Sequence, residues 1–177
     1  MENFRKFLFV CIAISAISFS SCKKEDVLIG TWNLGSSKLE FTSSNPLYSS
    51  TLNQFSGDIS QYISLPKTLT FSADGTGTYL SPFDNATEVF TYTHTDNKIA
   101  FYGVETGIFG MSENFVVDCQ FLDKNKTLNM RLDVTDVAKP YLAMIINGFI
   151  NESPIEIDLS EILETITKVD FTATYNK

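Results

Sequence analysis

Three pairs of alternating apolar and polar segments, each joined by a short polar turn, constrain the fold of this chain most strongly. The first pair spans residues 67–80 and turns at Asp74-Gly75, a dipeptide typical of tight β-hairpins because the turn requires positive φ angles. The second pair spans residues 90–101, and the third spans residues 115–134. An alternation with a period of two predicts antiparallel strands with one face buried and the other in water.

Two more segments show the same alternation, at residues 27–42 and 169–175, and bring the predicted total to eight strands. Consecutive hairpins with short turns favour an up-and-down arrangement. Pairing the last strand with the first would remove both sheet edges, and eight strands close into a barrel whose interior can hold one small ligand. The sequence therefore predicts a mainly β fold, an eight-stranded antiparallel barrel. A two-sheet β-sandwich is the alternative that the same strand signals allow.

The period changes before the last strand, where two short helices are expected. Residues 137–150 are nearly all apolar, with Pro140 suited to a first helical turn and Asn147-Gly148 suited to a C-terminal cap. Asp158 with Glu161 resembles a capping box, and apolar residues then recur at helical spacing up to Ile166. A helix as apolar as the first one could fill the barrel and leave no room for a ligand.

A long polar segment separates the first strand from the first hairpin. Residues 43–65 are rich in Ser, Asn and Gln. This composition predicts a long loop, with a short helix near residues 52–55. Long loops inside compact domains are often functional or mobile, and here plain mobility is the expected reason.

The first 22 residues have the pattern of a lipoprotein signal peptide. Arg5 and Lys6 supply the positive start, residues 7–19 are an apolar run, and Ser20-Ser21 precede Cys22. The apolar run is too short to cross a bilayer as a helix, which takes roughly 20 residues. The segment is therefore expected to be a targeting signal that is cleaved from the mature protein.

The residues before Cys22 resemble the bacterial lipobox, with Phe19 where leucine is usual. This resemblance implies a diacyl or triacyl anchor on Cys22, which holds a protein firmly on a membrane. The predicted organisation is a lipoprotein signal peptide at residues 1–21, a lipidated tether at 22–27 and a single β domain at 28–177.

Cleavage before Cys22 would leave 11 basic and 20 acidic side chains, a net charge of −9. This balance argues against nucleic acid as a partner, because phosphates require Lys and Arg, and it leaves membrane attachment to the lipid. Cys119 would be the one other thiol, so no intramolecular disulfide is expected.

The run Lys23-Lys24-Glu25-Asp26 has two interpretations. It is a solvated tether, as charge runs usually are. Alternatively it is a sorting signal, because it is similar to the lysine-plus-acid signal that sends Bacteroidetes lipoproteins to the outside of the cell. The expected location is the outer membrane, through the lipid anchor, with exposure at the cell surface under the second interpretation.

The start of the first strand, Gly30-Thr31-Trp32, resembles the lipocalin Gly-x-Trp signature. The hairpin at residues 69–79 is similar to a second hallmark of the lipocalin-like lipoproteins of Bacteroidetes. The resemblance implies a barrel with Trp32 at its closed end and a basic residue from a late strand over the indole ring. Arg131, the one arginine of the mature chain, is the candidate for this barrel-closing role. The alternative is an arginine that faces solvent, opposite Leu128, Met130 and Leu132.

Signals for enzymatic chemistry are weak. His94 is the single histidine and shares a strand face with Phe90 and Tyr92, which favours a position in the core or at its boundary. One histidine and one thiol cannot form a usual zinc site, and residues 110–114 lack the last glycine of a nucleophile elbow. We therefore expect no enzymatic activity, no cofactor and no metal.

Two non-enzymatic functions compete. The first is binding of a small apolar or amphipathic ligand inside the barrel, in a pocket lined by Tyr79, Phe90, Tyr92, Phe101 and Tyr102. The second is a structural or protein-interaction module of an envelope complex, with a filled barrel. A void of roughly a few hundred Å³ would favour ligand binding, whereas a filled barrel or an exposed apolar patch would favour a protein partner.

Overall fold

The computed structural model describes residues 26–60, 63–108, 111, 113–150 and 159–177, so the predicted signal peptide and Cys22 lie outside the described residues. Eight strands form one closed antiparallel barrel in the order of the chain, and β8 pairs with β1. The predicted up-and-down barrel is confirmed, and the β-sandwich alternative is wrong. The strands are β1 (Gly30–Ser43), β2 (Thr68–Phe71), β3 (Thr76–Leu80), β4 (Thr87–Thr95), β5 (Lys98–Tyr102), β6 (Asn114–Leu122), β7 (Thr127–Asp133) and β8 (Ile166–Asn176).

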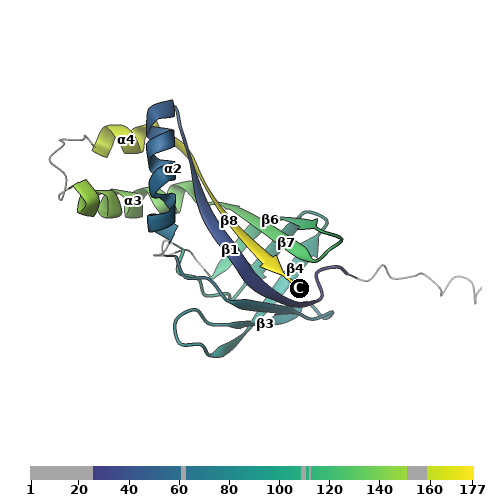
Figure 1. Ribbon diagram of the computed structural model, residues 1–177. Helices are drawn as coiled ribbons and strands as arrows, with labels where there is room; N and C mark the ends of the chain where they lie inside the picture. The colour runs from purple at the N-terminus through teal and green to yellow at the C-terminus, as the bar shows by residue number, and fades with distance from the viewer. Residues whose placement is uncertain (1–25, 61–62, 109–110, 112, 151–158) are drawn as a thin grey trace, which may run out of the picture.

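The two ends of the barrel differ in how the strands are connected (Figure 1). One end, which we call the closed end, carries the short β2–β3, β4–β5 and β6–β7 turns and the C-terminus. The other end, which we call the helical end, carries α2 (Pro46–Ser60), α3 (Thr135–Ile150) and α4 (Leu159–Thr165). Positive φ angles tighten the closed-end turns, at Gly75 between β2 and β3 and at Asp123, Lys124 and Asn125 between β6 and β7.

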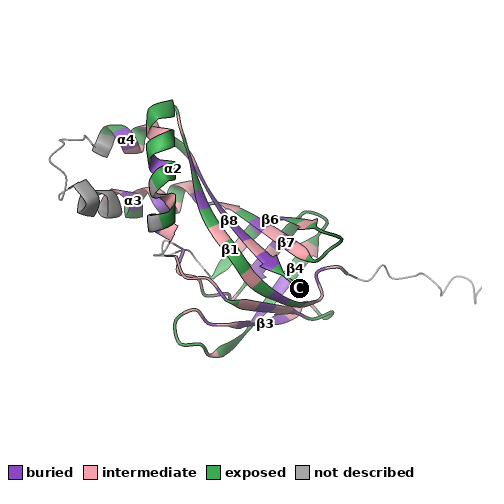
Figure 2. Cartoon of the chain, viewed as in Figure 1, coloured by how far each residue is buried: buried purple, intermediate pink, exposed green. Residues whose placement is uncertain are grey.

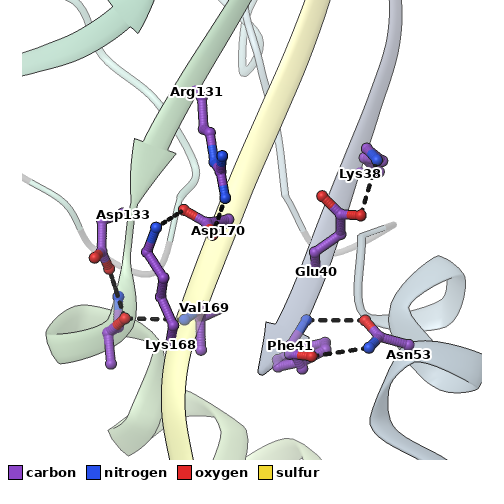
Figure 3. A network of polar contacts seen from close by, with 10 residues as sticks. Lys38, Glu40, Phe41, Asn53, Arg131, Asp133, Lys168, Val169 and Asp170 are labelled. Atoms are coloured by element: carbon purple, nitrogen blue, oxygen red, sulfur yellow. Dashed lines mark hydrogen bonds and ion pairs between the residues drawn. The ribbon is translucent and has the colours of Figure 1, made fainter. Parts of the chain in front are cut away.

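The two longest strands, β1 and β8, pair along almost their whole length, from Asn33 opposite Asn176 to Ser43 opposite Ile166. On its other side, β1 pairs with β2 only as far as Asn33. Beyond that point, α2 packs against β1 and contacts its edge at Phe41. The Asn53 side chain accepts a hydrogen bond from Phe41 N and donates one to Phe41 O, both at 2.8 Å (Figure 3). A helix side chain thus replaces the neighbouring strand.

The prediction of a loop at residues 43–65 is wrong for most of that segment, because α2 is 15 residues long. Asn45 caps the helix, since its side-chain oxygen accepts a hydrogen bond from Leu47 N at 3.0 Å. Leu52 and Ile59, two helical turns apart, are buried and hold α2 against the core. Most other positions are polar, and this composition hid the helical period.

Two helices precede β8, as predicted, but their boundaries differ. Thr135 N donates a hydrogen bond to Asp133 Oδ1 at 3.0 Å where α3 begins, and Pro140 lies inside the helix rather than in its first turn. Ile166 begins β8 rather than ending α4. α3 packs against α4 and β8 beyond the end of the barrel (Figure 1). The expected cap at Asp158 lies outside the described residues, and no described helix is long and apolar enough to cross a membrane.

One buried apolar cluster fills the barrel and continues into the helical end (Figure 2). Inward and outward side chains alternate along the strands, as in β4, where Phe90 and Tyr92 are buried and Thr91 between them is exposed. Leu142 of α3 and Ile162 of α4 belong to the same cluster. The helices are therefore packed parts of one core.

Candidate functional site

Aromatic side chains occupy the middle of the barrel. Phe71 on β2 makes edge-to-face contacts with Phe90 and Tyr92 on β4, with ring centroids 5.4 and 4.9 Å apart. Phe101 on β5 lies 5.7 Å from Phe90 and 6.0 Å from Phe71. Gly77 on β3 makes room for these rings, because a Cβ atom there would lie 2.3 Å from the ring of Phe90. Ring pairs at such distances stabilise the fold beyond the area they bury.

Two tyrosine hydroxyls attach covering segments to the helical end of the barrel. Tyr79 Oη accepts a hydrogen bond from Glu105 N at 3.0 Å. Tyr175 Oη donates one to Pro66 O at 2.9 Å. Burial raises the pKa of both phenols, so both stay protonated and able to form these bonds at neutral pH.

The covering segments, residues 63–66 and 103–108, are also joined to each other. Gly107 N donates a hydrogen bond to Ser64 O at 2.8 Å. A Cβ atom on Gly107 would lie 2.9 Å from Ser64, so this close approach requires a glycine. The two segments are therefore joined to each other across the helical end of the barrel.

The cavity that remains beneath the covering segments has a volume of about 40 Å³. Its walls come from β2, β5, β6, β7, β8 and the covering segments, and no described residue of α3 borders it. Small-molecule sites have volumes of roughly 300–1,000 Å³, so this space is far too small for a typical ligand. The inward side chains of the strands fill the barrel. Residues 137–143 of the helix expected as a plug do not line the cavity, and the side chains of residues 144–150 lie outside the described part of the chain.

Four of the five residues predicted to line a ligand pocket point inward and are buried: Tyr79, Phe90, Tyr92 and Phe101. Among these four, Phe101 alone borders the cavity, because the others pack among the aromatic rings. The prediction for Tyr102 is wrong, because its side chain lies on the outer face of β5 and is 46% exposed. Neighbouring residues of a strand point to opposite faces, so Phe101 and Tyr102 cannot both enter the barrel.

Trp32 is completely buried at the closed end, where its Nε1 donates a hydrogen bond to Leu28 O at 2.7 Å. The cation over its ring is Lys177, whose Nζ lies 4.7 Å from the ring centroid and donates a hydrogen bond to Val27 O. The predicted barrel-closing role of Arg131 is therefore wrong. The residues on either side of Arg131 point into the barrel, which leaves its side chain on the outer face.

Arg131 belongs instead to a charged cluster on the outer face of β7, β8 and β1 (Figure 3). Asp170 on β8 has a side chain that is only 5% exposed. Its carboxylate forms ion pairs with both Arg131 and Lys168. Burial alone would raise the pKa of Asp170, but the two cations hold this pKa below its ordinary value. On β1, the more exposed Lys38 and Glu40 pair at 3.0 Å. Each charge has an opposite neighbour, which suits the cluster to holding strands together.

The histidine and the described thiol take part in packing. His94, at the end of β4, lies with Nδ1 3.2 Å from Asp26 Oδ1 and with its ring against Phe121. Cys119 is buried on β6, and burial together with Asp118 raises the pKa of its thiol to about 11. Such a thiol is protonated and unreactive at neutral pH. Among the described residues, no three His, Cys, Asp or Glu side chains are placed to hold a metal.

Three exposed apolar side chains lie close together on the outside of the barrel. Val89 on β4, Tyr102 on β5 and Val116 on β6 are 68, 46 and 51% exposed. Thr91 pairs with Tyr102, and Ala100 pairs with Val116, so the three lie on a diagonal across neighbouring strands. We call these three residues the outer strip. The strip was not predicted from the sequence, although apolar residues at outward positions of alternating strands were the available signal.

No protein-family model, curated protein or solved structure matches this chain. The geometry of the barrel and the N-terminal sequence therefore have to indicate the function. Two geometric features bear on it most directly: a barrel filled by its own side chains, and an outer strip that is exposed to solvent.

Proposed function

We propose that this protein is a non-enzymatic, lipid-anchored module of the cell envelope that acts through protein contacts, with the barrel as its rigid scaffold. The filled barrel carries the proposal. Aromatic side chains occupy its middle, and the remaining cavity of about 40 Å³ is far smaller than a ligand site. A scaffold, unlike a carrier, requires no internal space, and dense packing makes it rigid.

The outer strip supports a protein partner. Val89, Tyr102 and Val116 are exposed and adjacent, and contiguous exposed apolar side chains favour a contact with another protein. Tyrosine is also enriched among the residues that dominate binding energy at interfaces. The outward residues paired with Tyr102 and Val116, Thr91 and Ala100, are uncharged. The exposed charges beside Val116 and Ala100, Asp118 and Lys98, pair with each other at 3.3 Å.

The N-terminal sequence supports attachment to a membrane. The positive start, the apolar run and the small residues before Cys22 are those of a lipoprotein signal peptide. We place the protein in the outer membrane through lipid on Cys22, with Lys23-Lys24-Glu25-Asp26 as the tether and sorting signal that brings the barrel to the cell surface.

Native mass spectrometry of the chain from Lys23 onward, produced in its own host, tests the filled barrel. We expect the mass of the bare polypeptide, unchanged after incubation with host lipid and glycan extracts. A stoichiometric small molecule that is released on denaturation would overturn the proposal and establish a ligand carrier.

Photo-crosslinking in the host tests the outer strip. A photo-reactive amino acid at Val116 is expected to give a protein adduct of discrete mass, and Tyr102→Glu should abolish this adduct. The same photo-reactive residue at Lys38, on the charged side of the barrel, is the matched control and should give none. Equal labelling at both positions, or no adduct at Val116, would contradict the proposed contact.

A further inference from the structure

The closed end of the barrel holds Asp26 and Val27, the last two residues of the tether, in place. Asp26 Oδ1 accepts a hydrogen bond from Leu28 N at 2.9 Å. The same carboxylate lies 3.2 Å from Nδ1 of His94, at the end of β4. Lys177, at the C-terminus, donates a hydrogen bond to Val27 O at 2.8 Å. The position at which the tether enters the domain is therefore fixed at the closed end.

The tether is short compared with the domain. Four peptide steps separate Cys22 from Asp26, and a fully extended chain of that length reaches about 14 Å at most. β1 has 14 residues, which corresponds to roughly 45 Å of extended strand. A lipid on Cys22 would therefore keep the closed end near the membrane, and a barrel that stands on this end would hold the helical end far from it.

Charge is distributed unevenly between the two ends. Among the described residues, the closed end carries four basic and four acidic side chains, so this end is neutral overall. The whole net charge of −9 lies on the rest of the mature chain. The closed-end set comprises Lys98, Lys124, Lys126 and Lys177, with Asp26, Asp74, Asp96 and Asp123.

The β6–β7 turn gives the closed end a surface suited to lipid headgroups. Lys124 and Lys126 are exposed, and the preceding Leu122 exposes 39% of its surface. Lysines near an anionic bilayer are attracted to it, and this attraction decays within a Debye length of about 8 Å. The acidic helical end lies several such lengths away, so its repulsion by the same bilayer is screened.

We propose that the closed end of the barrel docks on an anionic membrane surface, with the β6–β7 turn against the headgroups and the helical end directed away from the bilayer. This inference rests on the proposed lipid anchor at Cys22. It assigns a membrane-facing surface to a protein whose total charge alone argues against contact with anionic lipid. It also leaves the outer strip on the side of the barrel, open to a partner.

Fluorescence quenching on vesicles tests the orientation. The lipidated full chain carries a fluorophore at Thr95→Cys, at the closed-end terminus of β4, or at Leu47→Cys in α2, which is 69% exposed. The vesicles contain phosphatidylglycerol, phosphatidylcholine and a lipid with a spin-labelled headgroup. We expect several-fold stronger quenching at residue 95 than at residue 47. Equal quenching at the two sites, in protein that floats with the vesicles, would overturn the docking and leave the anchor intact. Failure to float would overturn the anchor and the docking together.

A pair of charge variants tests the surface itself. The double variant Lys124→Glu with Lys126→Glu should still float, but its quenching at residue 95 should fall several-fold. The matched variant, Lys67→Glu with Lys139→Glu, changes the same charge away from the closed end and should leave quenching unchanged. Vesicles of phosphatidylcholine alone should reproduce the effect of the first variant. Unchanged quenching in that variant would overturn the docking surface.

Discussion

At the scale of single residues, the filled interior depends on a glycine opposite an aromatic ring. Gly77 and Phe90 face each other across β3 and β4, and the Phe90 ring lies where a side chain at position 77 would be. The same ring contacts Phe71, Tyr79 and Phe101. Phe90 is therefore a side chain whose removal would strongly change the interior.

Phe90→Ala is expected to lower the free energy of unfolding by about 3–5 kcal/mol, because it removes buried surface and leaves a void. The void should admit a small apolar probe such as toluene, which would then raise the unfolding midpoint of the variant in urea. Wild type, with its small cavity, should show no such stabilisation. Val89→Ala, at the exposed neighbouring position, is the control and should change stability by less than about 0.5 kcal/mol. Equal stabilisation of wild type by toluene would contradict a filled barrel.

Asp170→Asn tests the charged cluster on the outer face. The substitution removes the negative charge that Arg131 and Lys168 share, and it leaves both cations beside a nearly buried neutral group. We expect a loss of about 1–3 kcal/mol in urea unfolding. Glu40→Gln breaks the exposed pair with Lys38 and should cost less than about 1 kcal/mol. Similar losses in both variants would show that burial of Asp170 adds nothing to its pairing.

Residue positions could be predicted where strand alternation decides them. Phe90, Tyr92 and Phe101 are predicted to point into the barrel because each lies on the apolar side of its alternating strand. The prediction for Tyr102 followed its aromatic side chain and ignored that it neighbours the inward Phe101, so it must point outward. The cation over Trp32 could not be found in this way, since Lys177 meets Trp32 only when the two ends of the chain come together at barrel closure.

At the scale of elements, α2 hydrogen-bonds to the edge of β1 at a point where no neighbouring strand pairs with it. β1 extends beyond β2, and its exposed edge would be a template for pairing with another chain. Asn53 pairs with both backbone groups of Phe41, and Ser49 Oγ donates a further hydrogen bond to Phe41 O. The helix thus protects the edge that the long β1–β8 pairing creates.

Asn53→Ala should expose that edge. We expect a loss of about 1 kcal/mol, because the Phe41 backbone loses two hydrogen bonds near solvent. The specific readout is hydrogen exchange, which should become faster at Phe41 N. Gln54→Ala, at the next and exposed position of α2, is the control and should leave this amide unchanged. Unaltered exchange at Phe41 in the Asn53 variant would show that α2 does not protect the edge.

Elements differ in how far sequence could predict them, and the reason is the range of the contacts that form them. The three hairpins were predictable because local turn residues such as Asp74-Gly75 fix both strands of each pair. α2 could not be predicted, because its sequence is mostly polar and only Leu52 and Ile59 are buried. Its stability comes from packing against β1, a tertiary contact that local sequence patterns do not reveal. Pro140 was expected in the first turn of α3, which placed the predicted start of this helix too late. α3 instead begins at Thr135, beside Asp133.

At the scale of the whole molecule, barrel closure places ionisable groups in the interior. Burial raises the pKa values of Tyr79, Tyr92 and Tyr175 and brings that of the Cys119 thiol to about 11, from an ordinary 9.0. All of these groups are neutral when protonated, so the folded state binds their protons more tightly than the unfolded state. Asp170 has the opposite shift, since its cationic neighbours hold its pKa below 3.8.

These opposite shifts predict a stability plateau with two edges. A group with a raised pKa in the fold contributes fully below its unfolded pKa, and this contribution is lost as pH rises through the folded value. Stability should therefore begin to fall near pH 9, where the unfolded thiol ionises, and fall further above pH 10 as tyrosines ionise. The contribution of Asp170 is present above pH 3.8 and is lost below it.

Urea unfolding midpoints measured across the pH range check both edges of this plateau. In Cys119→Ala, the alkaline decline should begin about one pH unit later than in wild type, nearer the ordinary tyrosine pKa of 10.0. In Asp170→Asn, the part of the acid decline that comes from Asp170 should disappear. A midpoint that stays constant from pH 9 to 11 would mean that water reaches these groups in the folded barrel. That result would contradict the dry, filled interior on which the proposed scaffold function depends.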